Sequence, residues 1–303
     1  MENDAVLAAL LEITAREGIP CAFDFQAYEM TKSKLRSDRF FRECGVPVPE
    51  YYPAGNAPYI LKPSGESGSA GVQFLADAAV CEAALASKED PENWIVQEYL
   101  NGPSYSIEVI GTPGHYRTYA VTQIHMDPVF DCCKVTTPCP DLPEELHQTF
   151  SDIAVTLAEG LKLHGIMDVE VIHDRGRLAV LEIDARLPSQ TPLAILFSTG
   201  VNLLTELCDV TFRRQRPRAA ETCRWTAYEH YRREGERIVQ EGEHMMSEAR
   251  PLGRYGGPAE LAVLDRPLTE DGFRGIFITS AESPEELEAK RNALKEHIWK
   301  AIH

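Results

Sequence analysis

A predicted hairpin of alternating acidic and apolar residues constrains this chain more than any other feature. Residues 165–173 and 177–184 each alternate with a period of two, and the turn-forming sequence Asp174-Arg175-Gly176 joins them. Alternate side chains of a β-strand share a face, so each strand carries one acidic and one apolar face. The pattern therefore predicts two antiparallel strands whose apolar faces are buried together.

The two acidic faces meet in only one class of register. Asp168 and Glu170 share a face of the first strand, and Glu182 and Asp184 share a face of the second. Glu170 lies across from Glu182 if the loop is odd, such as a three-residue turn over 175–177, or if a strand contains a bulge. A two-residue turn alone would put the acidic sets on opposite faces. Four clustered carboxylates repel one another, which predicts a divalent cation such as Mg²⁺ between them; a solvated acidic surface is the alternative.

A second candidate site is the small-residue loop over 63–71, which follows an apolar strand at 59–61. Small residues let backbone N–H groups approach phosphates closely, and Lys62 adds a positive charge at the strand end. The loop matches neither the Walker A sequence nor the dinucleotide-binding fingerprint, and a plain β-hairpin explains it equally well. Considered alone, Lys34 belongs to the solvated face of a helix.

Charge and composition exclude several classes of protein. The 303 residues carry a formal net charge of −17, which argues against nucleic acid as a partner because phosphate contacts need clustered Lys and Arg. No apolar run reaches membrane-spanning length, and the N-terminus lacks the features of a signal peptide. The eight cysteines include no Cys-x-x-Cys pair, which favours reduced thiols. We therefore expect a cytoplasmic protein with no membrane partner.

Helix and strand signals along the chain predict an α+β (α/β) protein. Helices are expected over 3–16, 26–43, 78–87, 143–162, 191–198 and 201–212, with a last helix that begins near 283. Strands are expected over 19–23, 59–61, 72–75, 94–96, 104–111, 116–124, 165–173, 177–184, 223–230, 259–264 and 273–278, with a polar linker over 213–220.

Taken in order, several motifs resemble the ATP-grasp family: Gly45-Val46-Pro47-Val48-Pro49, Ile60-Leu61-Lys62-Pro63, Val96-Gln97-Glu98-Tyr99-Leu100-Asn101-Gly102 and Glu182-Ile183-Asp184-Ala185-Arg186. The resemblance implies the ATP-grasp fold, in which two α+β subdomains sandwich ATP. The family pattern usually has Asn at the position of Asp184, and Pro103 and Ser104 replace its acidic ribose contact. The resemblance implies Mg²⁺ ligands at Glu170, Glu182 and Asp184, and ATP contacts at Lys34, Lys62, Ser67, Ser69, Gln97, Glu98, Tyr99 and Leu100.

A longer match is similar to the ligase family that joins 3-methyl-D-ornithine to L-lysine in pyrrolysine biosynthesis. It is carried by the segments 23–28 and 165–170 and by the run 182–192. In that family ATP phosphorylates the carboxylate of 3-methyl-D-ornithine, and the ε-amine of L-lysine attacks the acyl phosphate. The resemblance implies small-molecule substrates, Arg186 as the catalytic clamp, and substrate contacts at Glu2, Asp168, Arg186, Ser189 and Gln190.

The resemblance also implies a division of the chain. We expect a truncated Rossmann-like N-terminal domain over 1–28, a linker helix and small ATP-grasp subdomain over 29–103, a large subdomain with the metal site over 104–215, and a covering subdomain over 216–303. The shortened first domain predicts an exposed apolar face on the first helix, which invites association such as a homodimer. Either the start is misassigned or truncated, or another chain supplies the missing part.

Two other functions stay open at this point. One is a different ATP-grasp ligase for amino acids or dipeptides. The other is an inactive ATP-binding remnant that has lost the N-terminal part of the enzyme.

Overall fold

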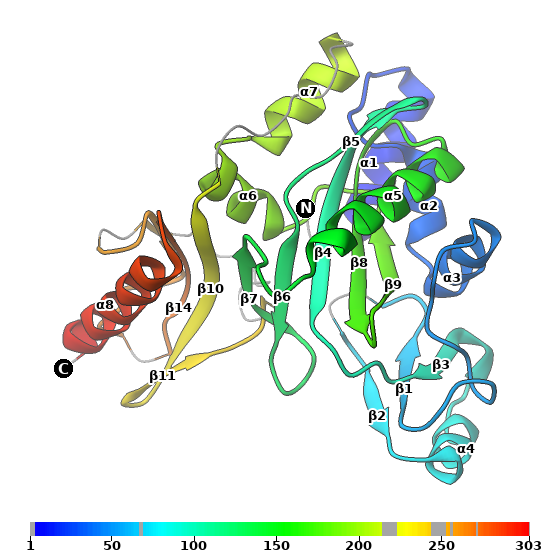
Figure 1. Ribbon diagram of the computed structural model, residues 1–303, viewed down its shortest axis with the longest axis horizontal. Coiled ribbons are helices and arrows are strands. Elements are labelled where there is room, and N and C mark those ends of the chain that lie inside the picture. Colours follow the sequence, from blue (N-terminus) through cyan, green and yellow to red (C-terminus); the bar gives the residue numbers. More distant parts are fainter. Residues whose placement is uncertain are drawn as a thin grey trace.

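The computed structural model describes residues 4–66, 69–213, 223–243, 253–254, 257–270 and 272–302 (Figure 1). The predicted substrate contact Glu2 and the predicted ATP contact Ser67 lie outside these residues, as does most of the predicted linker over 213–220. The N-terminal region consists of three helices: α1 (Asp4–Glu17), α2 (Phe25–Thr31) and α3 (Lys34–Glu43).

Two predictions for this region are wrong. Residues 19–23 connect α1 to α2 through bends and form no strand. The single helix predicted over 26–43 is interrupted, because Ser33 has extended backbone angles and acts as the N-cap residue of α3. The interruption redirects the chain, so that a new helix begins at Lys34. The backbone N–H of Lys34 donates to the Ser64 carbonyl oxygen at 2.9 Å.

The first helix buries one stripe and exposes another. Leu7 and Leu11 pack into the main hydrophobic core, whereas Val6, Leu10 and Ile13 are 43–46% exposed. The buried and the exposed apolar residues therefore lie on two neighbouring faces of the same helix. The predicted exposure of an apolar face on this helix is confirmed.

A small subdomain follows, in which a three-stranded antiparallel sheet packs on one helix. The sheet has the order β2-β1-β3. Its core contains Tyr59, Leu61, Leu75, Cys81 and Val96. The elements are β1 (Tyr59–Pro63), β2 (Gln73–Leu75), α4 (Ala78–Ala86), the short 3₁₀ helix η1 (Pro91–Asn93) and β3 (Trp94–Glu98).

The large subdomain is built on the strands that carry the acidic hairpin. The strand predicted over 116–124 is wrong as a single element, because two separate short strands, β5 and β6, both pair with β4. A further strand, β7, was not predicted. The elements are β4 (Ser104–Thr112), β5 (His115–Thr118), β6 (Thr122–Met126), β7 (Cys132–Thr137), α5 (Glu144–Leu161), β8 (Gly165–Asp174), β9 (Arg177–Asp184), α6 (Thr191–Thr199) and α7 (Leu203–Arg213).

The C-terminal region continues the same sheet rather than forming a separate one. In the described residues the strand order is β12-β13-β14-β10-β7-β6-β4-β8-β9, with β5 and β11 paired at the sides. Figure 1 shows α8 lying across β14 and β10. The elements are β10 (Trp225–Glu234), β11 (Arg237–Gln240), β12 (Gly253–Arg254), β13 (Leu261–Leu264), β14 (Arg274–Ala281) and α8 (Pro284–Ile302).

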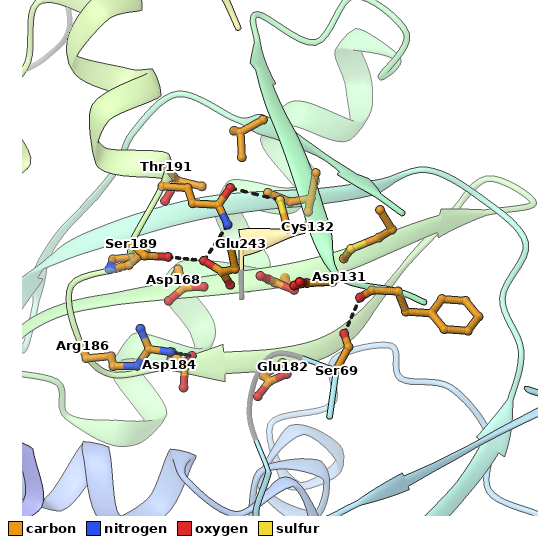
Figure 2. A pocket seen from close by; sticks show the side chains of 17 residues that line it. Ser69, Asp131, Cys132, Asp168, Glu182, Asp184, Arg186, Ser189, Thr191 and Glu243 are labelled. Carbon is orange, nitrogen blue, oxygen red and sulfur yellow. Dashed lines mark hydrogen bonds and ion pairs between the residues drawn. The ribbon is translucent and has the colours of Figure 1, made fainter. Parts of the chain in front are cut away.

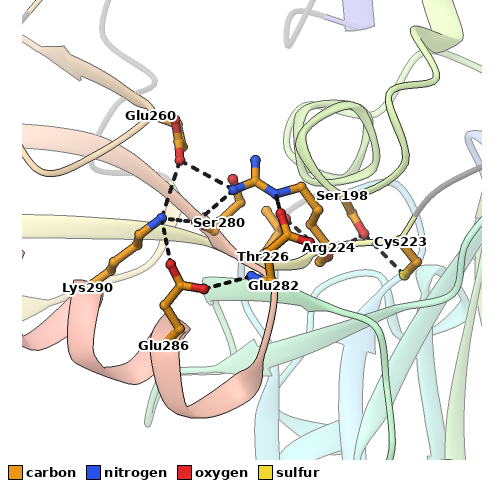
Figure 3. Close-up of polar contacts among 9 residues, drawn as sticks. All are labelled: Ser198, Cys223, Arg224, Thr226, Glu260, Ser280, Glu282, Glu286 and Lys290. Carbon is orange, nitrogen blue, oxygen red and sulfur yellow. Dashed lines mark hydrogen bonds and ion pairs between the residues drawn. The ribbon is translucent and has the colours of Figure 1, made fainter.

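Polar contacts fasten the start of α8 to the neighbouring strand ends (Figure 3). Lys290 donates to the Ser280 carbonyl oxygen at 2.8 Å. Arg224 pairs with Glu282 at 2.9 Å, and Ser283 accepts the backbone N–H of residue 286, as expected for a capping residue. Exposed ion pairs contribute little to stability individually, so the network mainly fixes the position of the helix.

The hairpin of β8 and β9 has the register that brings its acidic faces together. Its turn contains only two residues, Arg175 and Gly176, with φ of 51° and 77°. A bulge in β9 inserts Leu181 as an unpaired residue, so Glu170 lies opposite Glu182. Of the two alternatives, the structure contains the bulge and not the three-residue turn.

Two further expectations concern covalent chemistry and membranes. All eight cysteines are free thiols. Within the described residues, no single helix has the length and apolar composition needed to cross a membrane, although α6 and α7 meet that criterion together as a pair bent by 98°.

Candidate active site

Two rows of polar side chains run across β4, β8 and β9 on one face of the sheet. Because side chains at paired positions lie side by side, the register places Glu108, Asp168 and Asp184 in one row. Glu170 and Glu182 belong to the neighbouring row. The carboxylates predicted to meet on this face are therefore next to one another.

Two cations already contact this carboxylate face. The Nζ atom of Lys34 lies 2.6 Å from Glu182 Oε1 and also donates to the Glu66 carbonyl oxygen at 2.7 Å. Burial lowers the pKa of Lys34, but Glu182, Asp184 and Glu170 together outweigh burial, so the net pKa is raised. Arg186 Nη2 lies 2.8 Å from Asp184 Oδ2. The two cations thus hold one carboxylate of each row.

The other two carboxylates, Glu170 and Asp168, lie among neighbouring carboxylates that repel them. Burial, followed by repulsion from Glu182 and Asp184, raises the pKa of Glu170 to about 8. Burial and the same kind of repulsion raise the pKa of Asp168 well above its usual range. Such a cluster suits a hard divalent cation. In the described part of the chain, no group of three or more acidic, imidazole or thiol side chains is arranged so that it could hold a metal ion.

A cavity of about 510 Å³ separates the small sheet from the large one, next to these carboxylates. Its volume is in the range of small-molecule and cofactor sites. Lys62 is 8% exposed, lines this cavity from β1, and has its pKa lowered by burial. Apolar side chains also line the cavity: Ile60, Val72, Leu100, Met126, Ile172 and Leu181.

The predicted hinge residues form one edge of the cavity, but two of their side chains are engaged in the protein. Gln97 Nε2 donates to Asp38 Oδ2 at 2.6 Å. Glu98 Oε1 accepts from Arg177 Nη2 at 2.9 Å. Tyr99 also lines the cavity. One polar atom of each of these two side chains is therefore already engaged within the protein.

The small-residue loop closes over the cavity onto the turn between β6 and β7. Ser69 Oγ donates a short hydrogen bond to the carbonyl oxygen of Phe130. Both residues have a positive φ, 57° for Ser69 and 66° for Phe130, a conformation that non-glycine residues adopt at a cost. The loop therefore joins the small subdomain to the large one across the mouth of the cavity.

A second, smaller cavity of about 120 Å³ continues from the first past Glu170 and Glu182. We call it the acidic pocket. Figure 2 shows its side chains converging from β8, β9, the start of α6 and the segment that contains Glu243. Glu243 Oε2 accepts from Ser189 Oγ and from Gln190 Nε2, both at 2.7 Å. Other residues that line it are Asp131, Cys132, Asp168, Asp184, Arg186 and Thr191.

The sequence predictions named eight of the acidic pocket's residues and missed others. The predicted residues that line it are Ser69, Asp168, Glu170, Glu182, Asp184, Arg186, Ser189 and Gln190. Glu243 was missed because a sequence pattern does not report which distant segment reaches a site.

Glu108 was also missed, although a signal was available. It is a single acid in a strand whose alternate positions are apolar, so it shares a face with Ser104 and Ser106. Its carboxyl is fully buried and lacks a hydrogen bond of normal geometry. Burial raises its pKa to about 7, and the nearby Thr191 hydroxyl partly offsets this effect.

Known proteins are similar to this chain in sequence and in fold. A family model described as an ATP-grasp domain matches residues 31–190. The 3-methyl-D-ornithine–L-lysine ligase of Methanosarcina acetivorans is 37% identical over 257 residues, which cover 84% of this chain and 67% of that protein. The enzyme of the same name from Methanosarcina mazei is 32% identical over 305 residues, covering 96% of this chain and 75% of that protein. The chain thus spans about two thirds to three quarters of these relatives.

A solved structure supports the same fold at low sequence identity. The biotin carboxylase domain dimer of the Hydrogenobacter thermophilus 2-oxoglutarate carboxylase has a TM-score of 0.75 and 14% identity, covering 95% of this chain and 70% of that one. That structure contains MgADP, ADP and bicarbonate.

Proposed function

Since the chain belongs to the ATP-grasp family and is an ATP-dependent carboxylate–amine ligase, we propose that it joins 3-methyl-D-ornithine to the ε-amine of L-lysine. This reaction, a step of pyrrolysine biosynthesis, is named in its relatives in Methanosarcina. We further propose that the carboxylate is activated as an acyl phosphate and that the 510 Å³ cavity binds ATP.

The observation that carries this proposal is the charge of the acidic pocket, which opens directly into the nucleotide cavity. If Glu170, Glu182 and Asp184 are assigned to Mg²⁺, other carboxylates remain, among them Asp168 and Glu243. Within the described residues, Arg186 is the one cationic side chain that lines the pocket. A donor with one carboxylate and two ammonium groups complements this arrangement, whereas an amino acid with an uncharged side chain leaves buried negative charge unpaired.

The protein side chains supply binding and orientation. Lys34 and Lys62 line the cavity beside the carboxylates, where they hold phosphate oxygens. Arg186, whose side chain is 18% exposed and lies beside Asp184, orients the donor carboxylate towards the phosphates. Mg²⁺ held by Glu170, Glu182 and Asp184 would neutralise charge on the transferred phosphoryl group.

The proposed reaction has two bond-forming steps. A donor carboxylate oxygen attacks the γ-phosphorus of ATP, the bond to the bridging oxygen breaks, and ADP leaves. The neutral ε-amine of L-lysine then attacks the carbonyl carbon of the acyl phosphate. The carbon–oxygen bond to phosphate breaks, the amine nitrogen loses a proton, and the products are an amide and inorganic phosphate.

The proposal is tested by measuring ADP release with ATP, Mg²⁺, L-lysine and 3-methyl-D-ornithine, omitting one component at a time. We expect release to require both amino acids and mass spectrometry to detect the amide. Glu182→Gln should abolish turnover because it removes a carboxylate from the metal site, while circular dichroism shows a retained fold. ADP release that does not depend on one of the two amino acids would refute the substrate assignment. Full activity of Glu182→Gln would refute the metal assignment.

A further inference from the structure

A short segment of the C-terminal region reaches into the acidic pocket. After β11 the chain continues beside β10, where the Glu241 N–H donates to the His230 carbonyl oxygen, and presents Glu243 to the start of α6 (Figure 2). Ser189 and Gln190 both donate to the same oxygen of this side chain, Oε2, at 2.7 Å. In the described part of the chain no donor is hydrogen-bonded to the other oxygen, Oε1. The carboxylate is therefore fixed in orientation while one of its oxygens stays available to a ligand.

The position of this segment depends on a glycine. A Cβ atom on Gly242 would lie 1.9 Å from Asp131 Oδ2 and 2.1 Å from Asp131 Cγ. No side chain fits at that distance, so the backbone at Gly242 rests directly on the Asp131 side chain. This close packing brings the following residue, Glu243, to the pocket wall.

Within the described residues, no cationic side chain is paired with the Glu243 carboxylate. Its two hydrogen-bond donors, Ser189 and Gln190, are neutral. Arg186 is held by Asp184 at 2.8 Å. Two further acidic residues, Asp131 and Asp168, line the same pocket. A partly buried carboxylate among other carboxylates is costly unless a positively charged group of the ligand pairs with it.

We infer that Glu243 binds the side-chain ammonium group of the donor amino acid and thereby selects diamino acids over analogues of the same length without that group. The inference rests on the proposed function for the identity of the donor. It concerns binding, so it is measurable apart from catalysis. A charge-assisted hydrogen bond of this kind corresponds to about a 10- to 100-fold difference in affinity.

The test compares two donors that differ only in the terminal ammonium group, D-ornithine and D-norvaline. Isothermal titration calorimetry in the presence of MgADP measures the affinity of the whole chain for each. We expect wild-type protein to prefer D-ornithine by about 10- to 100-fold. Glu243→Gln, which keeps the shape and one acceptor, should lose most of that preference by weakening D-ornithine alone. Glu236→Gln, the same change at an exposed position in the turn between β10 and β11, is the matched control and should keep it.

A second variant tests the geometry. Gly242→Ala should displace Glu243 and also reduce the preference for D-ornithine, with MgADP affinity unchanged in both variants. A wild-type protein without the preference, or a Glu243→Gln protein that keeps it, overturns the inference. A change in MgADP affinity in Glu243→Gln also overturns it, because this would assign Glu243 to the metal. Failure of the proposed function looks different: the preference in binding remains, but ADP release does not depend on L-lysine.

Discussion

Replacing Glu170 by Gln should stabilise the ligand-free protein, and the gain should grow with pH. Folding raises the pKa of Glu170 from 4.5 to about 8, through burial and repulsion from Glu182 and Asp184. Between these two values the native state holds a proton that the unfolded state has lost. The contribution of this group to the free energy of unfolding is therefore greatest below about pH 4.5 and is lost as the pH rises towards 8.

Glutamine is neutral in both the native and the unfolded state, so the variant does not lose free energy of unfolding as the pH rises. Integrating the proton difference gives a gain of about 1 kcal/mol at pH 5.5 and about 4 kcal/mol at pH 8. These are upper limits, because neighbouring side chains relax around an ionised carboxylate. At roughly 2–4 °C per kcal/mol for a domain of this size class, Tm should rise by a few degrees at pH 5.5 and by more at pH 8.

Thermal unfolding of wild-type and Glu170→Gln proteins at both pH values, without nucleotide or metal, measures this difference. Glu182→Gln is the matched control on the neighbouring strand. It removes the partner that lies 2.6 Å from Lys34 and should lower Tm. If Glu170 and Glu182 both ligate Mg²⁺, both variants should lose the stabilisation that MgADP gives. A Glu170→Gln protein that is no more stable than wild type, or equally stabilised at both pH values, would refute the reasoning.

Three further perturbations follow from other contacts. Gly102→Ala should shift the hinge, because a Cβ atom there would lie 1.9 Å from the His173 carbonyl oxygen; calorimetry should show weaker MgADP binding, and unchanged affinity would contradict the prediction. Arg291→Ala leaves the buried carboxylate of Glu229 without its bidentate partner and should cost about 3–5 kcal/mol of unfolding free energy, measured by denaturant titration. Ser69→Ala removes the hydrogen bond across the cavity mouth and should raise KM for ATP about 2- to 10-fold with kcat little changed; an equal fall in kcat would contradict it.

The sequence predicted the part of the site that depends on local periodicity. Alternation along β8 and β9 identified Asp168, Glu170, Glu182 and Asp184 as residues of one face, and the parity of the turn reduced the choice to an odd loop or a bulge. The sequence did not decide between these two. Leu181 is the unpaired residue, and no local pattern in the sequence reports where a bulge falls.

The errors arise where tertiary contacts override local propensity. The segment 116–124 is rich in residues with strand propensity, but Tyr119 and Val121 join two different hydrophobic cores, and the strand is divided between them. The helix predicted over 26–43 breaks at Ser33, whose hydroxyl lies 3.2 Å from the Ser64 hydroxyl. Glu243 comes to the acidic pocket from a segment 53 residues beyond Gln190, a distance in sequence that no periodicity covers.

The pairing of β10 with β7 has a consequence for protein engineering. Because Thr226, Ala227, Tyr228 and Glu229 pair with the edge of β7, removing the C-terminal region would uncover a strand edge with unsatisfied backbone groups in the middle of the sheet. Such edges pair with other chains and promote aggregation. Exchange of this region between relatives to alter donor choice therefore needs to carry β7 and β10 together, as one cassette cut at the loops outside both strands.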